Sequence, residues 1–505
     1  MEQGDFEIEK QKTGKQLYHY QEKDLEQVFD RFENCPDNYN LLYQLPTGGG
    51  KTVVFSEITR QYIKQKNKKV LILTHRIELS RQTSNMLTEF NVNNKVINSQ
   101  VKDFPDQDGF MCFVAMVETL NNRLNDNIFT LEEVGLVIID EAHYNSFRKL
   151  FKFFENCFIL GVTATPLSSN IKLPMKDIYQ ELIVGSSIEF LIENSFLAKA
   201  ITYSYDVGLS GLLKVGINGD YTVKSSEDLY NSLTMQNKLL TAYNQRGKGK
   251  KTLIFNNGIN TSRQVYETFT AAGYDIRHLD NTNTKQQRKE ILAWFKTKPN
   301  AILTSVSILT TGFDEPTIET IILNRATRSL SLYFQMIGRG SRVLPNKPSF
   351  DVIDMGNNLA RFGLWSQAID WPKIFRSPHY FLENIISDDQ IERQFRYVMP
   401  EDLRSEFPNS ESIEFDISGE NEKVIADGLK TSVILDRSLE QHLKMILENS
   451  DEFPKALELL RCIDDDISDR IRQYSYCITN STRNYREWVL QDYKKKLRTR
   501  IIQEF

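Results

Sequence analysis

The sequence predicts an α/β protein with two tandem parallel-sheet domains, followed by a mainly α-helical C-terminal region. Two series of strand-like apolar runs alternate with polar or amphipathic helical patterns. The runs are apolar throughout rather than at every second residue, which is typical of parallel sheets covered by helices on both faces. Near residue 366 the hydrophobic period becomes helical, and charge runs such as CIDDDISDR follow. We therefore expect domains at residues 12–200, 201–365 and 366–505.

Each series contains five strand candidates. Those of the first are NLLYQL, KVLILTH, FMCFVAM, VGLVIID and CFILGVTAT. Those of the second are KTLIFNN, YDIRHLD, NAILTSV, ETIILNR and SFDVIDMG. A glycine-rich stretch, VGLSGLLKVGINGDYTV, lies between the two series and predicts a surface excursion rather than a core strand.

Composition sets outer limits on the function. The 505 residues are 40% hydrophobic, which allows each of about three domains to bury a core. The net charge of −5 gives no overall basic signal, so any nucleic acid must be bound by local lysines and arginines. An apolar run of about 18 residues is absent from the sequence, as is a charged-then-apolar leader, so we expect a cytoplasmic protein without a membrane span. The five cysteines form no C-x-x-C pair, so neither a zinc site nor a disulfide framework is expected.

The stretch LLYQLPTGGGKTVVF, residues 41–55, carries the first chemical signal. Its apolar start resembles a strand end and its continuation has helical spacing, so the glycines form a strand-to-helix loop. Such a loop offers backbone N–H groups and a positive helix end to a phosphate chain. Lys51 would reach the outer phosphates and Thr52 would ligate Mg²⁺. An ordinary tight turn is the alternative, because the strict phosphate-loop pattern has glycine where this chain has Leu45.

A second signal is the acidic pair at the end of VGLVIID. Ligands of open parallel sheets bind beyond the carboxyl ends of strands, where Asp140 and Glu141 fall. Asp140 would hold Mg²⁺ while Glu141 would orient and deprotonate the attacking water. His143 would link this site to the opposite domain. The alternative is that the acids only cap the following helix.

A third signal is YFQMIGRGSR, residues 333–342. Gln335, Arg339 and Arg342 recur every three or four residues, so on a helix they would share a face. Arginines on one helix face are usually solvated or paired with acids. In a second domain that faces a nucleotide site, they would instead act as arginine fingers on the transferring phosphoryl group.

Taken together, residues 15–360 resemble a superfamily 2 helicase with two RecA-like domains. HYQEKDLEQV resembles the adenine-recognising segment of that family, with Gln21 as its glutamine. LPTGGGKT, LTHRIELSRQ, DEAH and GVTATP resemble motifs I, Ia, II and III, and VAMVETL a further strand-contacting motif. TLIFNNGINTSRQV, TTGFDEP and QMIGRGSR resemble motifs IV, V and VI. The motif sequences resemble those of DEAH-box proteins and are most similar to those of RadD-like bacterial DNA repair helicases. Such proteins can carry a cysteine cluster, which has no counterpart in this sequence.

The resemblance implies an ATP-driven motor with ATP and Mg²⁺ as cofactors. It implies catalytic roles for Lys51, Asp140, Glu141, Gln335, Arg339 and Arg342. The implied nucleotide-binding residues are Gln21, Thr47, Gly48, Gly49, Gly50, Lys51, Thr52 and Asp314, with Thr52 and Asp140 on the metal. The implied coupling residues are His143, Thr163 and Thr165. Candidate nucleic-acid contacts are Thr74, His75, Arg76, Thr310, Thr311 and Gly312, although threonines and glycines at strand ends are also common turn residues.

The C-terminal stretch NYREWVLQDYKKKLRTRII, residues 484–502, is ambiguous. Its basic and aromatic residues suit nucleic-acid binding, but they also suit a surface helix with its aromatics in a core. The function that we expect is an ATP-dependent helicase or translocase acting on DNA in repair or recombination. The alternatives are a motor component of a multi-protein restriction or defence assembly, which binds a protein partner through the C-terminal helices, and an RNA helicase.

Overall fold

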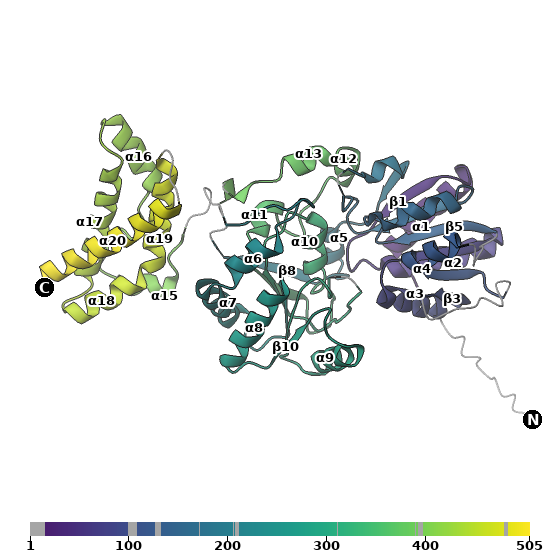
Figure 1. Ribbon diagram of the computed structural model, residues 1–505, viewed down its shortest axis with the longest axis horizontal. Helices are drawn as coiled ribbons and strands as arrows, with labels where there is room; N and C mark the ends of the chain where they lie inside the picture. The colour runs from purple at the N-terminus through teal and green to yellow at the C-terminus, as the bar shows by residue number, and fades with distance from the viewer. Residues whose placement is uncertain are drawn as a thin grey trace, which may run out of the picture. The chain divides into compact units, whose positions relative to one another are not determined.

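The computed structural model describes residues 16–98, 109–126, 133–170, 172–205, 207, 212–310, 312–388, 390–391, 397–478 and 483–505 (Figure 1). The chain divides into two compact units, Met1–Asp388 and Asp389–Phe505. The first unit contains both sheets and the second is helical. This arrangement confirms the predicted fold class.

The first sheet is seven-stranded and parallel, in the order β3-β4-β2-β5-β6-β1-β7. Its strands are β1 (Asn40–Gln44), β2 (Lys69–Thr74), β3 (Asn94–Ile97), β4 (Cys112–Met116), β5 (Val134–Asp140), β6 (Phe158–Thr163) and β7 (Glu181–Val184). The inner strands β2 and β6 are buried at every residue, as expected for a sheet covered on both faces. The two strands at the sheet edges, β3 and β7, are partly exposed and were not predicted, since their short sequences lack a continuous apolar run.

The remaining elements of this domain precede, connect or follow its strands. The helices are α1 (His19–Asn34), α2 (Lys51–Lys66), α3 (Ile77–Glu89), α4 (Val117–Asn125) and α5 (Ile188–Glu193), with the 3₁₀ helices η1 (Asn145–Phe153) and η2 (Met175–Asp177). Apolar residues of α1 and α2 pack in one core with β1 and β2, including Val28, Val54 and Ile58, each fully buried.

The second sheet is six-stranded and parallel, in the order β10-β11-β9-β12-β13-β8. Its strands are β8 (Lys199–Ser204), β9 (Thr252–Asn256), β10 (Ile276–Leu279), β11 (Ile302–Ser305), β12 (Thr320–Asn324) and β13 (Ser349–Asp354). Its helices are α6 (Val223–Tyr230), α7 (Leu233–Arg246), α8 (Ile259–Ala271), α9 (Lys285–Thr297), α10 (Leu330–Ile337) and α11 (Asn358–Phe362). The edge strand β8 was not predicted, because its sequence KAITYS is polar at several positions and only partly buried. The second sheet consequently starts at Lys199 rather than after residue 200.

The first unit continues past residue 365, where the expected third domain begins. Helices α12 (Trp371–Arg376) and α13 (Pro378–Glu383) belong to it. The ring of Phe375 is buried in a core formed by strands and helices of the first domain, and Lys176 donates a hydrogen bond to the Arg376 carbonyl. The α-helical C-terminal unit therefore begins after Asp388, because the aromatic and aliphatic residues of α12 are buried against the sheet domains rather than in the helical unit.

The C-terminal unit has its own hydrophobic core. Its helices are α15 (Glu401–Arg404), α16 (Ile417–Ala426), α17 (Ser432–Glu448), α18 (Phe453–Cys462), α19 (Asp464–Cys477) and α20 (Arg483–Glu504). A buried polar network joins three of them: His442 on α17 contacts Asp466 on α19 at 2.6 Å and the Tyr493 hydroxyl on α20 at 2.9 Å. Among the described residues of the whole chain, each helix is too short or too polar to cross a membrane.

Candidate nucleotide and nucleic-acid site

Three adjacent strands carry the three predicted motifs of the first domain. Strands β1, β6 and β5 pair in parallel, with Gln44 opposite Thr163 and Asp140 opposite Val162. Their carboxyl ends therefore meet at one edge of the sheet, where the glycine loop follows β1 and the acidic pair ends β5. This position is where ligands bind in open parallel sheets.

The loop after β1 has the backbone of a phosphate cradle. Gly48 and Gly50 have φ values of 93° and 88°, in the left-handed region that favours glycine. The first backbone hydrogen bond of α2 runs from the Val54 amide to the Gly50 carbonyl. The amides at the start of α2 consequently have no intrahelical acceptor, and the positive end of the helix faces the loop.

Two side chains of α1 hold this loop from behind. Gln21 Nε2 and the Tyr20 hydroxyl both donate to the Gly49 carbonyl, at 3.1 and 2.8 Å. Gln21 lies so close that a Cβ added at Gly50 would be 2.4 Å from its Nε2. The predicted nucleotide-binding glutamine thus contacts the loop itself, and sequence reasoning did not identify Tyr20 as its companion.

Lys51 lies among the charges of the site. Its Nζ donates to the carbonyls of Leu45 and Pro46, at 3.3 and 3.4 Å. Burial lowers the pKa of Lys51, while the nearby carboxylates of Glu141 and Asp140 oppose that shift. Burial and the Glu141 charge raise the pKa of Asp140 to about 7. A magnesium ion beside Asp140 would oppose this shift and keep the carboxylate charged near neutral pH. The raised pKa of Asp140 is therefore compatible with a role as a magnesium ligand.

Glu141 has an unusual backbone and an uncommitted oxygen. Its φ of 54° is rare for a residue with a side chain and costs on the order of 1 kcal/mol or more. Burial raises the pKa of Glu141, but the charges of Lys51, His143, His75 and Arg339 outweigh it and the pKa is lowered. Within the described residues, Glu141 Oε2 is buried and accepts no hydrogen bond, and it lies 3.4 Å from His143 Nδ1. A charged carboxylate whose oxygen accepts no hydrogen bond suits a group that orients water.

His143 connects the two domains. Its Nδ1 lies 3.0 Å from Thr163 Oγ1, and its Nε2 lies 3.2 Å from Gln335 Nε2 on α10. Thr163 Oγ1 donates its own proton to the Thr165 carbonyl, so Nδ1 of His143 carries the hydrogen and Nε2 accepts from Gln335. Burial lowers the pKa of His143, which keeps the ring neutral as this pattern requires.

A second bond crosses between the domains next to it. Thr165 Oγ1 donates to Ser331 Oγ at 2.6 Å. Ser331 was not predicted from the sequence, although it lies one helical turn before Gln335 on α10. Serine at such a position has no signature of its own, so only the fold identifies it.

The two predicted arginines do not share a helix face with Gln335, which corrects the sequence argument. Helix α10 ends at Ile337, because Gly338 and Gly340 follow and both pack closely against neighbours. Arg339 instead lies in the turn beyond the helix and donates to the Phe313 carbonyl at 2.5 Å. Arg342 Nε donates to Asp314 at 2.8 Å. Both arginines still reach the site, since both influence the pKa of Lys51.

The glycines of this turn allow the two domains to touch. A Cβ at Gly338 would lie 2.6 Å from Thr47 Cγ2. A Cβ at Gly48 would lie 2.8 Å from Ser341 Oγ and 3.2 Å from an Arg342 nitrogen. The loop after β1 and the turn after α10 are therefore in direct contact, and neither tolerates a larger residue without movement.

Some of the predicted nucleic-acid contacts are buried, and others contact the opposite domain. Thr74 and Thr310 are buried and hydrogen-bond to Ser80 Oγ and the Ser307 carbonyl, so their side chains face the interior rather than a ligand. Arg76 donates to the Ile308 carbonyl of the second domain, and the Gly312 carbonyl accepts from Gln82 of the first. These are contacts between the two domains at the predicted strand-binding loops. Thr311 lies outside the described residues.

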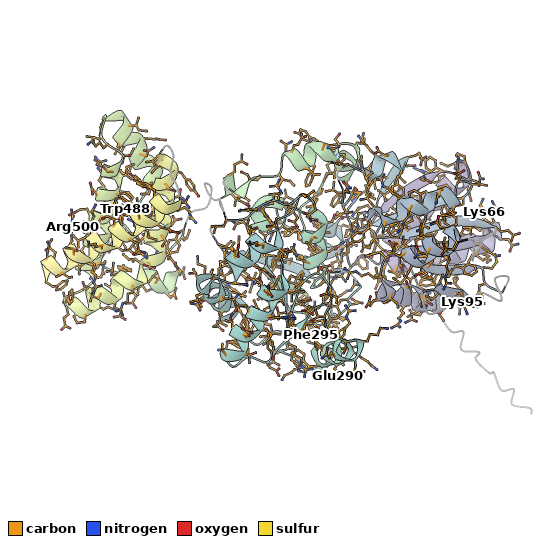
Figure 2. All side chains as sticks on the ribbon, in the orientation of Figure 1. Lys66, Lys95, Glu290, Phe295, Trp488 and Arg500 are labelled. Atoms are coloured by element: carbon orange, nitrogen blue, oxygen red, sulfur yellow. The ribbon has the colours of Figure 1, made fainter. Side chains whose placement is uncertain are left out.

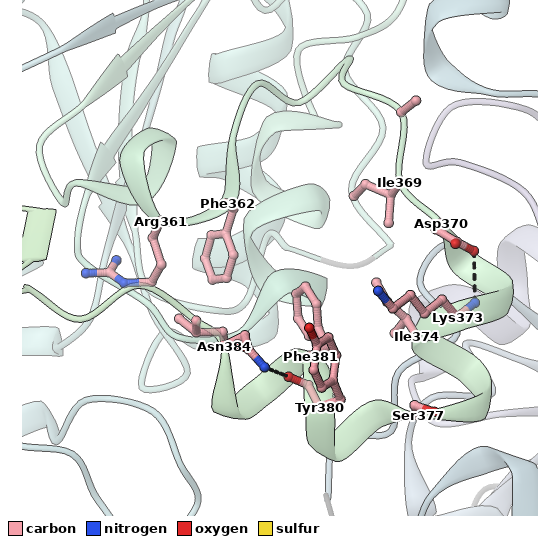
Figure 3. Close-up of a pocket in the computed structure, with 12 residues that line it drawn as sticks. Arg361, Phe362, Ile369, Asp370, Lys373, Ile374, Ser377, Tyr380, Phe381 and Asn384 are labelled. Atoms are coloured by element: carbon pink, nitrogen blue, oxygen red, sulfur yellow. Dashed lines mark hydrogen bonds between the residues drawn. The ribbon is translucent and has the colours of Figure 1, made fainter.

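A pocket of about 290 Å³ lies away from this site (Figure 3). It is formed around α12 and α13 and the end of α11. Phe362, Ile369, Ile374 and Phe381 supply apolar walls, and Lys373 and Asp370 supply charge. Its described lining includes none of the predicted motif residues.

The residues present fit ATP with Mg²⁺. The glycine loop offers a cradle for phosphates, and Lys51 and the raised pKa of Asp140 mark where phosphate and metal charges would be compensated. Arg339 completes the set from the second domain: burial lowers its pKa to about 10, which leaves it charged at neutral pH.

Comparisons with known proteins agree with this geometry. Residues 14–168 match the family model of the res subunit of type III restriction enzymes, and residues 233–343 match the helicase conserved C-terminal domain. A 51.5 kDa protein of a Lactococcus phage (isolate 7-9) is 30% identical over 337 residues, which cover 66% of this chain and 69% of the phage protein. The chain belongs to the superfamily 2 helicases.

Two further similarities describe the extent of this membership. A Saccharomyces cerevisiae protein named as an ATP-dependent helicase, IRC3, is 30% identical over 330 residues, which cover 61% of this chain and about half, 47%, of that protein. A fragment from Vibrio vulnificus YJ016, assigned to the HsdR subunit of a type I restriction enzyme, aligns with a TM-score of 0.54 and 21% identity, and the alignment covers 68% of this chain and 65% of that one. The second likeness concerns the fold alone.

Membership confirms that this helicase hydrolyses ATP with Mg²⁺ and binds nucleic acid. The narrower resemblance to DEAH-box and RadD-like proteins stays a prediction, because the matched models and the relatives above carry other descriptions.

Proposed function

We propose that this helicase is a DNA-dependent ATPase that moves along or unwinds DNA, in repair or recombination. One observation carries the proposal: the glycine loop of one domain contacts the turn of Arg339 and Arg342 in the other, and His143, beside the acidic pair, is bonded to Gln335. A site built from both domains links each ATP cycle to their separation and closure, which is the motion a translocase needs.

At the nucleotide, each residue has a role that its surroundings support. Thr52 and Asp140 would hold Mg²⁺, and Lys51 with the loop of Gly48, Gly49 and Gly50 would hold the phosphates. Because the Gly49 amide donates to the Pro46 carbonyl, the amides of Gly48 and Gly50 would be the donors of that loop. Thr47 and Gln21 would fix the loop, as the contacts of Gln21 with the Gly49 carbonyl suggest. When bound, Mg²⁺ supplies positive charge at the phosphates. Glu141 takes the proton of the attacking water on its free oxygen.

The second domain contributes its charges from one turn. Arg339 and Arg342 would stabilise the developing negative charge on the phosphoryl group. Asp314 positions Arg342 through the 2.8 Å hydrogen bond and so senses whether the nucleotide is present. Gln335, His143, Thr163 and Thr165 then transmit closure, because their hydrogen bonds join α10 to β6 and the end of β5.

Nucleic acid would lie along the loops that follow β2 and β11. Arg76 and Gly312, which hydrogen-bond across the domains there, are the residues best placed to contact its backbone, whereas His75, whose ring nitrogens are buried, would act through its packing. Such contacts are with phosphates, so binding should tolerate any sequence and weaken with salt. Thr74 and Thr310 would act indirectly, by holding the two loops in shape.

The C-terminal unit favours a protein partner over a nucleic acid. Val489, Tyr493, Leu497 and Ile501 of α20 are buried, and its Lys494 and Lys496 form ion pairs with Asp464 and Asp492. Acidic residues outnumber basic ones across residues 389–505. Trp488 is 61% exposed and is the most exposed large apolar side chain of the described part of α20 (Figure 2).

A second candidate function follows from that unit. The helicase would be the motor of a restriction or defence assembly, with the helical unit as its docking surface and little unwinding alone. The match of residues 14–168 to a restriction subunit model favours this candidate. RNA as the track is a third candidate, and a cytoplasmic location is compatible with all three.

The test is the rate of ATP hydrolysis with single-stranded DNA, duplex DNA and RNA, followed by strand displacement from a forked duplex. Stimulation by DNA with displacement supports the first candidate. Stimulation without displacement by the purified protein supports the second, and stimulation by RNA alone supports the third. The Trp488→Ala variant should keep its nucleic-acid affinity, whereas a loss of affinity would place nucleic acid on α20.

A further inference from the structure

Tyr144 directly follows the acidic motif DEAH. No role was predicted for it from the sequence, yet it contacts several residues of the site. Its ring lies between two histidines, with ring centroids 4.3 Å from His75 and 4.3 Å from His143. Its amide donates to the Glu141 carbonyl at 3.1 Å. Burial raises the pKa of its hydroxyl, and the side chain of Gln335 opposes that shift. One side chain thus contacts the loop after β2 and the acidic motif, and its neighbour His143 is bonded to Gln335 of α10.

His75 links the movement of the loop after β2 to the Tyr144 ring. Both of its ring nitrogens are buried and, within the described part of the chain, make no hydrogen bond. The ring is therefore held by packing, chiefly against Tyr144, and not by polar partners. The next residue, Arg76, binds the Ile308 carbonyl in the second domain. A shift of this loop must consequently move the Tyr144 ring, because close-packed rings cannot interpenetrate.

Tyr144 also contacts the catalytic groups of the acidic motif. Tyr144 is held to Glu141, whose left-handed backbone is strained and so sensitive to small displacements. The same ring packs against His143, which accepts the hydrogen bond from Gln335 that joins the two domains. Tyr144 therefore connects His75 of the predicted strand-binding loop to Glu141, the group that orients water.

We propose that Tyr144 is a positioning residue that couples nucleic acid on the loop after β2 to the alignment of Glu141 and Gln335. Nucleic acid that displaces His75 and Arg76 moves the ring, and the ring sets the Glu141 backbone for hydrolysis. This coupling rests on the proposed function, since it explains how a nucleic-acid track accelerates the ATPase. It adds a residue outside the helicase motifs to the path between the two ligands.

The first experiment compares kcat with and without saturating single-stranded DNA in the wild type, Tyr144→Phe, Tyr144→Ala and Tyr62→Ala. Tyr62 is the control, because it is a tyrosine of the same domain that is buried, packs against Phe32 and stacks on neither His75 nor His143. The stimulation ratio should fall about fivefold or more in Tyr144→Ala, with the KM for DNA changed by less than about twofold. Tyr144→Phe keeps the ring and should retain most of the stimulation.

The second experiment needs no nucleic acid. Coupling between sites is reciprocal, so a nucleotide analogue must alter the loop as nucleic acid alters the site. Amide hydrogen exchange of residues 75–80 should slow when ADP with beryllium fluoride binds the wild type and Tyr62→Ala. It should stay unchanged in Tyr144→Ala, provided that the analogue still protects the start of α2.

The outcomes separate the two proposals. If no nucleic acid stimulates the wild type but the analogue protects residues 75–80 only when Tyr144 is present, the proposed function fails and the coupling stands. If Tyr144→Ala keeps full stimulation, or protects the loop as the wild type does, the coupling is overturned. Equal losses in Tyr144→Ala and Tyr62→Ala also overturn it, because they indicate general destabilisation.

Discussion

His143 Nε2 on the acidic motif accepts a hydrogen bond from Gln335 on α10 at 3.2 Å, and both side chains are buried. The bond therefore joins the end of β5 in one domain to the second domain, directly beside Glu141. The catalytic site therefore includes residues of both domains when the two domains are in contact.

Replacing Gln335 with alanine should lower kcat by about tenfold, since the buried His143 nitrogen loses its donor and the domains lose one bond across the site. ATP binding, made largely by the first domain, should change little. Steady-state kinetics with a fluorescent nucleotide titration separate the two effects. Gln236→Ala is the matched control, because that buried glutamine of α7 bonds the Tyr230 carbonyl away from the site. A kcat equal to that of the control would remove Gln335 from the mechanism.

Thr165 and Ser331 should prove to be energetically coupled. Thr165→Val and Ser331→Ala each remove one partner of the 2.6 Å bond, so the second substitution should cost little once the first is made. We expect a coupling of about 1 kcal/mol in the activation free energy, measured from the kcat of the two single variants and the double variant. Independent, additive effects would show that the bond does not contribute to closure.

Gly50→Ala should weaken ATP binding beyond its effect on stability. The new Cβ would lie 2.4 Å from Gln21 Nε2, and φ is 88°. Gly249→Ala shares the backbone strain, at a φ of 79°, but its Cβ would meet nothing within 4 Å. Both variants should lose about 1 kcal/mol of stability. Only Gly50→Ala should raise the KM for ATP, and equal KM values in the two variants would contradict the role assigned to Gln21.

The helical unit should lose stability in mild acid. Burial, together with the Arg470 charge, lowers the pKa of His442 to about 4, although Asp466 opposes the shift. The unfolded chain, with a pKa near 6.5, then binds the proton more readily than the folded chain. Stability is therefore complete above about pH 6.5 and declines as the pH falls towards 4, by about 3 kcal/mol in total. Amide exchange in α17, corrected for its intrinsic pH dependence, measures this loss, and equal protection at pH 7 and pH 5 would contradict it.

The sequence predicted the parallel sheets because their inner strands are apolar throughout, as β2 and β6 are. It did not predict β3, β7 and β8, because strands at a sheet edge are half exposed and lose that signal. The boundary after residue 365 moved to Asp388, since burial of Phe375 against the first domain depends on contacts distant in sequence.

The motif residues of the nucleotide site came from the sequence, but their mutual geometry did not. Periodicity placed Arg339 and Arg342 on a helix that ends before them at Ile337, because spacing alone cannot show where a glycine pair stops a helix. Thr74 was selected as a ligand contact, yet its hydroxyl is bonded to Ser80 inside the domain. Ser331 and Tyr144 act through neighbours that only folding brings together.

If this helicase is a nucleic-acid-dependent ATPase, its hydrolysis should depend on Glu141. The steady-state ATPase rate of the wild type and Glu141→Gln, with and without single-stranded DNA, tests this dependence alongside ATP affinity. We expect DNA stimulation in the wild type, and in Glu141→Gln a rate lower by about a hundredfold or more with ATP affinity retained. A Glu141→Gln rate close to that of the wild type, or a wild-type rate indifferent to every nucleic acid, would contradict this expectation.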